Sequence, residues 1–248
     1  MQPALPRPPH ELLRNFTDQL AMPRIFIATS NAGKLRDFAA AAAQYGVEIV
    51  SLPGFGSLAS VVEDGATFED NARKKAEHYS RHLPTEIVLA DDSGLKVAAL
   101  QGAPGVMSAR YAFISGSRCI HVPNSLDVTV SGAGTGNAPD AENNSRLLAE
   151  LDGVPKSQRQ ARFVCVIAAA RGGKTLATFR GEAEGVILNE ARGSNGFGYD
   201  PLFHSMELGK TFAELSAEEK AAVSHRGRAF RKVLEWYRGE ESGAGARV

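Results

Sequence analysis

Residues 24–52 decide the fold, and they read RIFIAT (24–29), SNAGK (30–34), LRDFAAAAAQY (35–45), GV (46–47) and EIVSL (48–52). The first stretch is short, β-branched and aromatic, which is typical of a buried strand. The alanine-rich stretch has high helix propensity and stops at Gly46, so we expect a helix there. The last stretch returns as a second strand. This order of strand, loop, helix and strand indicates an α/β layer fold.

Further elements follow outward from this unit. Thr67 and Asp70 have the spacing of a capping box, which predicts a helix over 68–83. A strand over 86–90 is expected to end in an acidic turn at 91–94. Two glycines at 172–173 join β-rich stretches at 162–170 and 174–179 into a hairpin, which makes the sheet mixed rather than purely parallel. Helices are also expected over 140–151, from 217 onward behind a Ser216–Glu219 cap, and over 228–237.

Composition excludes several classes of protein. The chain has 248 residues, 28 Lys+Arg against 28 Asp+Glu, and 43% hydrophobic residues, which are the proportions of a folded globular chain. A net charge of zero gives no general attraction to nucleic acid or to an anionic membrane surface. The longest apolar stretch, 163–170, is too short to span a bilayer. We therefore expect no nucleic-acid partner and no membrane partner.

The expected domain organisation is a loose N-terminal tail over 1–22, one α/β domain over 23–238 and a flexible C-terminal tail over 239–248. The first segment lacks the apolar core of a secretory signal, and Met22 is a second candidate start site. Residues 113–138 are rich in small polar residues and are expected to form an insertion. Cys119 and Cys165 lack metal or redox spacing, so we expect free thiols in the cytoplasm.

The loop over 30–34 is the first candidate site. A strand-to-helix loop places backbone N–H groups and Lys34 at a helix N-terminus, which favours an anion. The loop is not a Walker A motif, because that motif needs glycine at the position of Ala28 and a hydroxyl at the position of Leu35. An ordinary loop with an exposed lysine is the alternative interpretation.

The acidic motif Asp91-Asp92-Ser93-Gly94 is the second candidate, because α/β sheets bind ligands at the carboxyl ends of strands. Neighbouring strand residues face opposite ways, so we expect one aspartate in the site and the other supporting the loop. Glu63 offers a second carboxylate, and one or two carboxylates with waters and phosphates hold Mg²⁺. A plain turn and a solvated loop charge are the alternatives.

Two C-terminal segments are the third candidate. Residues 193–200, GSNGFGYD, let the backbone approach a ligand closely and offer rings that could stack on a base. Lys220, Ser224, His225 and Arg226 lie near a helix end and could bind phosphate or carbonyl oxygens. The alternatives are aromatic rings folded into the core and ordinary surface charges.

Six motifs occur together and in order, and they cover about residues 23–237. They are TSNAGK (29–34), EDGATFEDNA (63–72), ADDSGL (90–95), GAPGV with SARY (102–106 and 108–111), GFGYDP (196–201) and SHRG (224–227). In this order they resemble the Ham1-like inosine triphosphate pyrophosphatase family. The resemblance implies an elongated mixed β-sheet flanked by helices, with a central nucleotide-binding cleft. It also implies hydrolysis of ITP, dITP and XTP to the monophosphate and pyrophosphate by a Mg²⁺-dependent homodimer.

The resemblance implies a role for each matched residue. Asp92 would be the general base and, with Glu63, would hold the metal, while Ser30, Asn31, Lys34 and Lys75 would hold the triphosphate. Ser93, Phe197, Gly198, Tyr199, Asp200, Lys220, His225 and Arg226 would hold the rest of the nucleotide. Selection of a 6-oxo purine requires hydrogen-bond donors aimed at O6, and Arg226 and backbone N–H groups are candidates.

The chain departs from the family pattern in two places. Residues 113–138 are inserted between the SARY motif and the helix that starts at Asp140, and Met107 stands where an aromatic residue is common. Neither lies at a matched catalytic position. A Maf-like pyrophosphatase acting on other nucleotides is one alternative reading, and a catalytically silent nucleotide-binding module is another. The presence of Glu63, Asp92 and Lys34 argues against the silent module.

Overall fold

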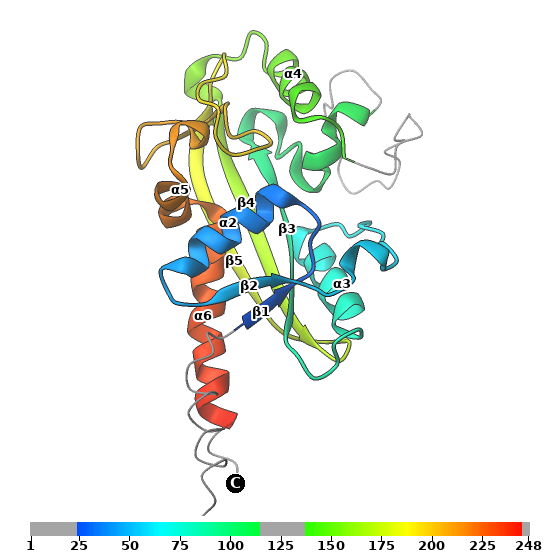
Figure 1. Ribbon diagram of the computed structural model, residues 1–248. Helices are drawn as coiled ribbons and strands as arrows, with labels where there is room; N and C mark the ends of the chain where they lie inside the picture. The colour runs from blue at the N-terminus through cyan, green and yellow to red at the C-terminus, as the bar shows by residue number, and fades with distance from the viewer. Residues whose placement is uncertain (1–23, 115–136, 245–248) are drawn as a thin grey trace, which may run out of the picture.

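The computed structural model describes residues 24–114 and 137–244, with side chains up to residue 239. Six strands form one sheet in the order β2-β1-β3-β4-β5-β6 (Figure 1). They are β1 (Arg24–Ile27), β2 (Glu48–Ser51), β3 (Val88–Val97), β4 (Gln160–Arg171), β5 (Lys174–Ile187) and β6 (Phe203–Ser205). β1 runs parallel to β2 and β3, and all other neighbours are antiparallel. The expected mixed sheet and β4–β5 hairpin are therefore confirmed.

The helices are α2 (Ala32–Ala43), α3 (Phe68–Ser80), α4 (Asp140–Glu150), α5 (Ala217–Val223) and α6 (His225–Ala244). Short 3₁₀ segments lie at Phe55–Ser57, Ala98–Leu100, Gly105–Phe113, Lys156–Gln158 and Phe212–Glu214. α2 begins earlier than expected because the Asn31 side chain accepts a hydrogen bond from the Lys34 N–H and caps the helix. The capping box of Thr67 and Asp70 at the start of α3 is confirmed.

Alternate residues of β3 supply two separate cores. Leu89 packs with Phe38 of α2 and Phe230 of α6, whereas Ala90 packs with Ala72 of α3. This follows from the pleat of a strand, in which successive side chains point to opposite faces. α2 and α6 therefore cover one face of the sheet and α3 covers the other (Figure 1).

The acidic turn expected at 91–94 was a wrong prediction. β3 continues through these residues to Val97, and β4 pairs with it along the whole stretch. Gly94 lets the segment over 105–108 pack closely against β3, because a Cβ there would lie 2.4 Å from the Ser108 Oγ and 2.6 Å from the Gly105 carbonyl oxygen. Asp91 and Asp92 consequently lie inside a strand, on opposite faces, rather than at its carboxyl end.

Several expectations fall at the ends of the described ranges. The tail over 1–22, Cys119 and most of the insertion over 113–138 lie outside the described residues. The described end of the insertion at Ala138 contacts the segment that precedes the insertion, since the Ala138 N–H donates to the Ala109 carbonyl oxygen at 2.9 Å. α6 includes residues 239–244 of the expected C-terminal tail. No helix in the described ranges is long and apolar enough to cross a membrane.

Candidate active site

The candidate site surrounds the part of β3 that has a neighbouring strand on one side only. β1 pairs with β3 through Val88 and Leu89, whereas β4 pairs with β3 up to Val97. Among the described strands, the edge of β3 opposite β4 therefore has no neighbour beyond Leu89, and the first bridge on that side is between Lys96 and Pro104. Side chains from both faces of β3 can reach a ligand that lies along this edge.

The α3 face of β3 carries an acidic cluster, which consists of Asp92, Glu63, Lys75 and Asn71. The Lys75 Nζ lies 2.8 Å from the Glu63 Oε2 and 3.4 Å from the Asp92 Oδ1. Asn71 donates from its Nδ2 to the Asp92 Oδ2 at 3.1 Å. Asn71 and Lys75 lie one turn apart on α3 and so share a helix face. Three of the residues that the family resemblance assigns to metal or triphosphate, Glu63, Asp92 and Lys75, are thus brought together.

The ionisation of the acidic cluster reflects one lysine shared by two carboxylates. Burial raises the pKa of Asp92 above its usual range, and the charges of Lys75 and Lys34 offset this only in part. Burial also opposes ionisation of Glu63, but the charge and hydrogen bond of Lys75 and the charge of Lys34 together outweigh it and lower that pKa. Burial would lower the pKa of Lys75, yet the charges of Asp92 and Glu63 raise it. Asp92 is therefore the carboxylate in the cluster that most readily takes up a proton.

The opposite face of β3 carries a basic cluster, which consists of Lys34, Asp91, Ser93, Arg226, Asp37, Lys220 and Asp200. The Lys34 Nζ lies 2.9 Å from the Asp91 Oδ2, and Asp91 also accepts from the Ser93 Oγ at 3.1 Å. Arg226 donates to the same Ser93 Oγ at 2.9 Å. α2, β3 and the start of α6 are thereby joined around one buried aspartate.

The remaining ion pairs of the basic cluster extend it away from β3. Asp37 of α2 lies 2.6 Å from the Arg226 Nη1 and 3.1 Å from the Lys220 Nζ. Lys220 also lies 2.6 Å from the Asp200 Oδ2. Three cations and three carboxylates alternate along this series of ion pairs, so most of their charge is neutralised within the cluster.

Charge pairing governs the pKa values here as well. Burial would raise the pKa of Asp91, but the charges of Lys34, Arg226 and Lys75 outweigh it and lower the pKa. For Asp200, burial dominates and raises the pKa despite the charge of Lys220. Burial, together with the charges of Arg226 and Lys220, lowers the pKa of His225 well below its ordinary value. His225 is therefore a neutral ring at physiological pH.

Three buried polar atoms near β3 have no hydrogen-bond partner within the described residues: the Asp91 Oδ1, the Arg226 Nε and the His225 Nδ1. Native proteins satisfy nearly all such atoms, so a group of them calls for a physical explanation. A polar ligand at the open edge of β3 would supply partners for donors and acceptors of this kind.

Phe197 connects the basic cluster to a cavity. Its ring lies under two cations, with the Lys220 Nζ at 5.1 Å and the Arg226 guanidinium at 5.3 Å from the ring centroid. Gly33 allows the close approach, because a Cβ there would lie 2.4 Å from the ring. A cavity of about 300 Å³ lies beside this ring, and Gly33, Asp37, Phe197 and Lys220 are among the residues that line it. Its aromatic and charged lining suits a flat, polar ring.

Some residues expected to hold the nucleotide have other contacts. Tyr199 is buried and donates its hydroxyl to the Ser108 carbonyl oxygen at 2.8 Å. The His225 ring stacks on Phe163 with centroids 4.7 Å apart. Gly198 uses its backbone, as its N–H donates to the Asp140 Oδ2 at 2.6 Å. These contacts support the walls of the site.

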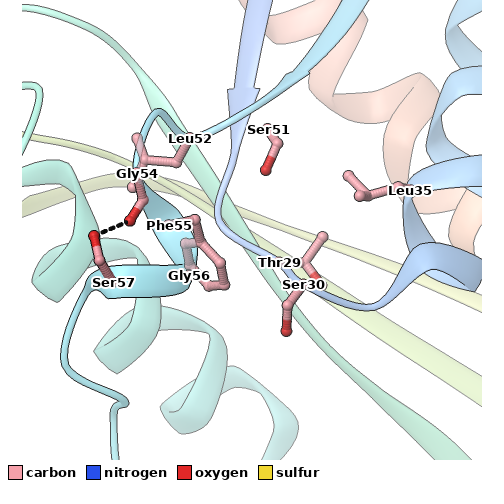
Figure 2. Close-up of a pocket in the computed structure, with 9 residues that line it drawn as sticks. All are labelled: Thr29, Ser30, Leu35, Ser51, Leu52, Gly54, Phe55, Gly56 and Ser57. Carbon is pink, nitrogen blue, oxygen red and sulfur yellow. Dashed lines mark hydrogen bonds between the residues drawn. The ribbon is translucent and has the colours of Figure 1, made fainter.

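Ser30 lines a larger, separate cavity of about 610 Å³ at the ends of β1 and β2. Figure 2 shows Thr29 and Ser30 on one side of it, facing Phe55 across the opening. Ser51, Gly54 and Ser57 complete much of the lining, and neither Asp92 nor Glu63 belongs to it. The lining is rich in hydroxyl groups and carries no charged side chain.

The acidic cluster suits a hard divalent cation. Glu63 and Asp92 converge on the ammonium of Lys75, and a metal ion would be attracted to the same oxygens. No third His, Cys, Asp or Glu joins them within the ranges that the structure describes. A carboxylate pair matches a cation that keeps several waters and takes further oxygens from substrate phosphates.

Sequence reasoning missed Asp37 and Asn71 as parts of the site. Asp37 lies three residues after Lys34 on α2, so the helical spacing that places both on one face could have indicated it. Asn71 likewise shares a face with Lys75. Sequence spacing did not show what these side chains contact, because their partners come from distant segments.

Fold and site together define an α/β protein whose binding groups are carboxylates on one face of a strand and paired lysine and arginine side chains on the other. This chain belongs to the Ham1 family, whose model matches residues 25–236. The family expectation drawn from the six motifs is thereby confirmed.

Two kinds of relatives agree with this membership. The chain is 48% identical to the dITP/XTP pyrophosphatase of Syntrophobacter fumaroxidans, over 86% of this chain and 84% of that relative. It is 46% identical to the dITP/XTP pyrophosphatase of Geobacillus kaustophilus, over 86% of this chain and 94% of that relative. Among solved structures, a HAM1 protein from Coxiella burnetii is 36% identical with a TM-score of 0.69, covering 88% of this chain and 100% of its own. The solved structure of the dITP/XTP pyrophosphatase of Mycobacterium abscessus is 38% identical with a TM-score of 0.60, and the match covers 85% of this chain and 98% of that one.

Proposed function

We propose that the chain hydrolyses the non-standard purine nucleotides dITP, ITP and XTP to the monophosphate and pyrophosphate, and so cleanses the nucleotide pool. The two bacterial relatives named dITP/XTP pyrophosphatase support this activity, since they share nearly half of their aligned residues with the chain. The enzyme is a nucleoside triphosphate pyrophosphatase, a hydrolase acting on phosphoric anhydrides.

The observation that carries the proposal is the acidic cluster at the open edge of β3. Release of pyrophosphate requires a water to attack the α-phosphorus, while the bond from that phosphorus to the bridging oxygen breaks and the oxygen leaves with pyrophosphate. Asp92 is the proposed acceptor of the proton of this water. Lys75 and Lys34 stabilise the negative charge that develops on the leaving group.

Mg²⁺ is the metal we propose for the carboxylate pair of Glu63 and Asp92. When bound, it neutralises phosphate charge and favours departure of pyrophosphate. Lys75 must release one or both carboxylates as the substrate arrives, and a phosphate oxygen is an equivalent partner for its ammonium. The acidic cluster without ligand is therefore held together by the same lysine that would afterwards bind substrate.

The basic cluster is the proposed nucleotide side of the site. Ser30 and Asn31, at the start of α2, together with Lys34 would hold the triphosphate. Ser93, Phe197, Gly198, Tyr199, Asp200, Lys220, His225 and Arg226 would hold the nucleoside, either directly or by supporting the walls. Arg226 and Lys220 are donors for the O6 atom of a 6-oxo purine, and adenine would leave such donors unpaired.

The assay that tests this function measures pyrophosphate release from ITP, XTP, GTP, ATP and dTTP side by side, with Mg²⁺ and with EDTA. We expect strong release from ITP and XTP that EDTA abolishes. Release from other nucleotides instead would favour a Maf-like activity. Silence on all five would favour a nucleotide-binding module and would overturn the proposal.

A homodimer in the cytoplasm is the assembly and location that the family resemblance suggests, and we propose both. The described cysteine, Cys165, is a free and buried thiol, as a reducing compartment allows. Light scattering that gives the mass of one 26.4 kDa chain would contradict the dimer.

A further inference from the structure

Asn71 hydrogen-bonds both to Asp92 on β3 and to the backbone of the loop that carries Glu63, whereas Lys75 contacts only the two carboxylates. Its Nδ2 donates to the Asp92 Oδ2 at 3.1 Å, and its Oδ1 accepts from the Gly65 N–H at 2.8 Å. The side chain is only 1% exposed. A single buried amide thus connects β3 to the backbone two residues after Glu63.

The orientation of the Asn71 amide is fixed by its two partners. A carboxylate can only accept a hydrogen bond and a backbone N–H can only donate one. Turning the amide over would place its oxygen against the Asp92 carboxylate and its NH₂ against the Gly65 N–H, and both contacts would be repulsive. The amide therefore holds Asp92 and the Glu63 loop in one relative position.

Gly65 is fitted closely to this amide. A Cβ at Gly65 would lie 2.6 Å from the Asn71 Oδ1 and 2.7 Å from the Asp70 Cβ. The same loop is also held from the other side, because the Arg110 Nη2 donates to the Glu63 carbonyl oxygen at 3.4 Å. A side chain at position 65 would push the loop away from the start of α3 and carry Glu63 with it.

We propose that Asn71 is a positioning residue that sets the spacing of Glu63 and Asp92 for a divalent cation. The inference rests on the metal pair of the proposed function. Asn71 contacts neither carboxylate oxygen of Glu63, and it acts on that residue through the loop backbone. Groups that orient metal ligands commonly change metal affinity by about 10–100-fold when removed.

The test measures binding of Mn²⁺ alone, without nucleotide, by the loss of the free-Mn²⁺ electron paramagnetic resonance signal. Asn71→Ala is expected to weaken Mn²⁺ binding about 10–100-fold. Asn143→Ala is the matched control, because Asn143 is another buried amide that ties loops together, accepting from the Ala112 N–H at 2.9 Å. It should lower thermal stability comparably and leave Mn²⁺ affinity unchanged.

A second pair of variants tests the same contact from its loop side and leaves the core of α3 untouched. Gly65→Ala is expected to weaken Mn²⁺ binding in the same direction as Asn71→Ala. Gly56→Ala is its control, because a Cβ at Gly56 meets no atom within 4 Å. This pair decides the question if Asn71→Ala fails to fold.

Each outcome separates the positioning role from the proposed function. Wild-type Mn²⁺ affinity in both Asn71→Ala and Gly65→Ala would overturn the positioning role, even if the enzyme releases pyrophosphate from ITP. A wild-type protein that turns over ITP without binding Mn²⁺ would also overturn it. Weakened Mn²⁺ binding in the two variants, in a protein silent on every nucleotide, would uphold the role and refute the activity.

Discussion

Asp91 and Asp92 are neighbours on β3, yet their surroundings give them opposite properties. Both are almost fully buried, at 2% and 6% exposure. The pKa of Asp91 is lowered because the cations around it outweigh burial, and the pKa of Asp92 is raised because burial outweighs the cations. The difference arises because Asp91 lies beside two cations, Lys34 and Arg226. Asp92 instead shares the single cation Lys75 with Glu63.

This contrast separates a structural acid from a reactive one. Asp91 has Lys34 within 2.9 Å and Arg226 near it, so its charge is already balanced by the fold. Asp92 has Lys75 at 3.4 Å and competes for it with Glu63. A carboxylate with too little positive charge nearby gains from a proton or a metal ion, which is what a catalytic base or a metal ligand requires.

The largest expected effect is on turnover when Asp92 is neutralised. Asp92→Asn removes the proton acceptor and one of two carboxylates at nearly constant volume. Turnover of ITP should fall by roughly 10²–10⁴-fold, the range for loss of a general base. Steady-state pyrophosphate release measures it, and circular dichroism checks that the fold is intact. Near wild-type turnover would remove Asp92 from the mechanism.

Asp91→Asn is expected to act on stability instead. It leaves Lys34 and Arg226 buried without their shared carboxylate, and breaking a buried ion pair from one side costs about 3–5 kcal/mol. Urea unfolding measures this loss. Asp152→Asn, on the exposed loop after α4, is the control and should unfold like the wild type. Equal stability of all three proteins would show that the basic cluster does not depend on Asp91.

The two variants should also differ in how pH changes their stability. For Asp92, whose folded pKa is raised, burying the charge costs stability above that pKa, and the cost disappears as the pH falls to the ordinary value of 3.8. For Asp91, whose folded pKa is lowered, the charge stabilises above 3.8 and is lost only as the pH falls below it.

Thermal unfolding between about pH 7 and pH 3 tests these signs. Asp92→Asn should melt above the wild type at neutral pH, and the difference should shrink on acidification. Asp91→Asn should melt below the wild type across the same range, with the gap closing only under 3.8. Differences of the same sign for both variants would contradict the contrast between the two faces.

Local patterns were enough to predict one part of this contrast. Strand pleat alone predicted that Asp91 and Asp92 face opposite sides of the sheet, and their separate partners Lys34 and Lys75 confirm this. The roles that the motifs assign to Glu63 and Lys34 stay predictions. The acidic turn was wrong because β4, far along the chain, pairs with β3 and extends it. The partner of Asp37 could not be assigned from sequence, since Lys220 is 183 residues away.

The smallest expected effect lies at the loop that carries Phe197. α4 holds the Gly198 peptide at both ends, with Asp140 accepting from its N–H at 2.6 Å and Asn144 donating to its carbonyl oxygen at 3.0 Å. Asn144→Ala removes one hydrogen bond, worth about 1 kcal/mol, and leaves the other. Because this peptide positions Phe197 in the nucleotide side of the site, the KM for ITP should rise about fivefold at unchanged kcat. Ser145→Ala, at the next position on α4, is the control and should leave the KM unchanged. A fall in kcat in Asn144→Ala would contradict this prediction, because it would show that α4 acts on the chemical step at the acidic cluster rather than on nucleotide binding.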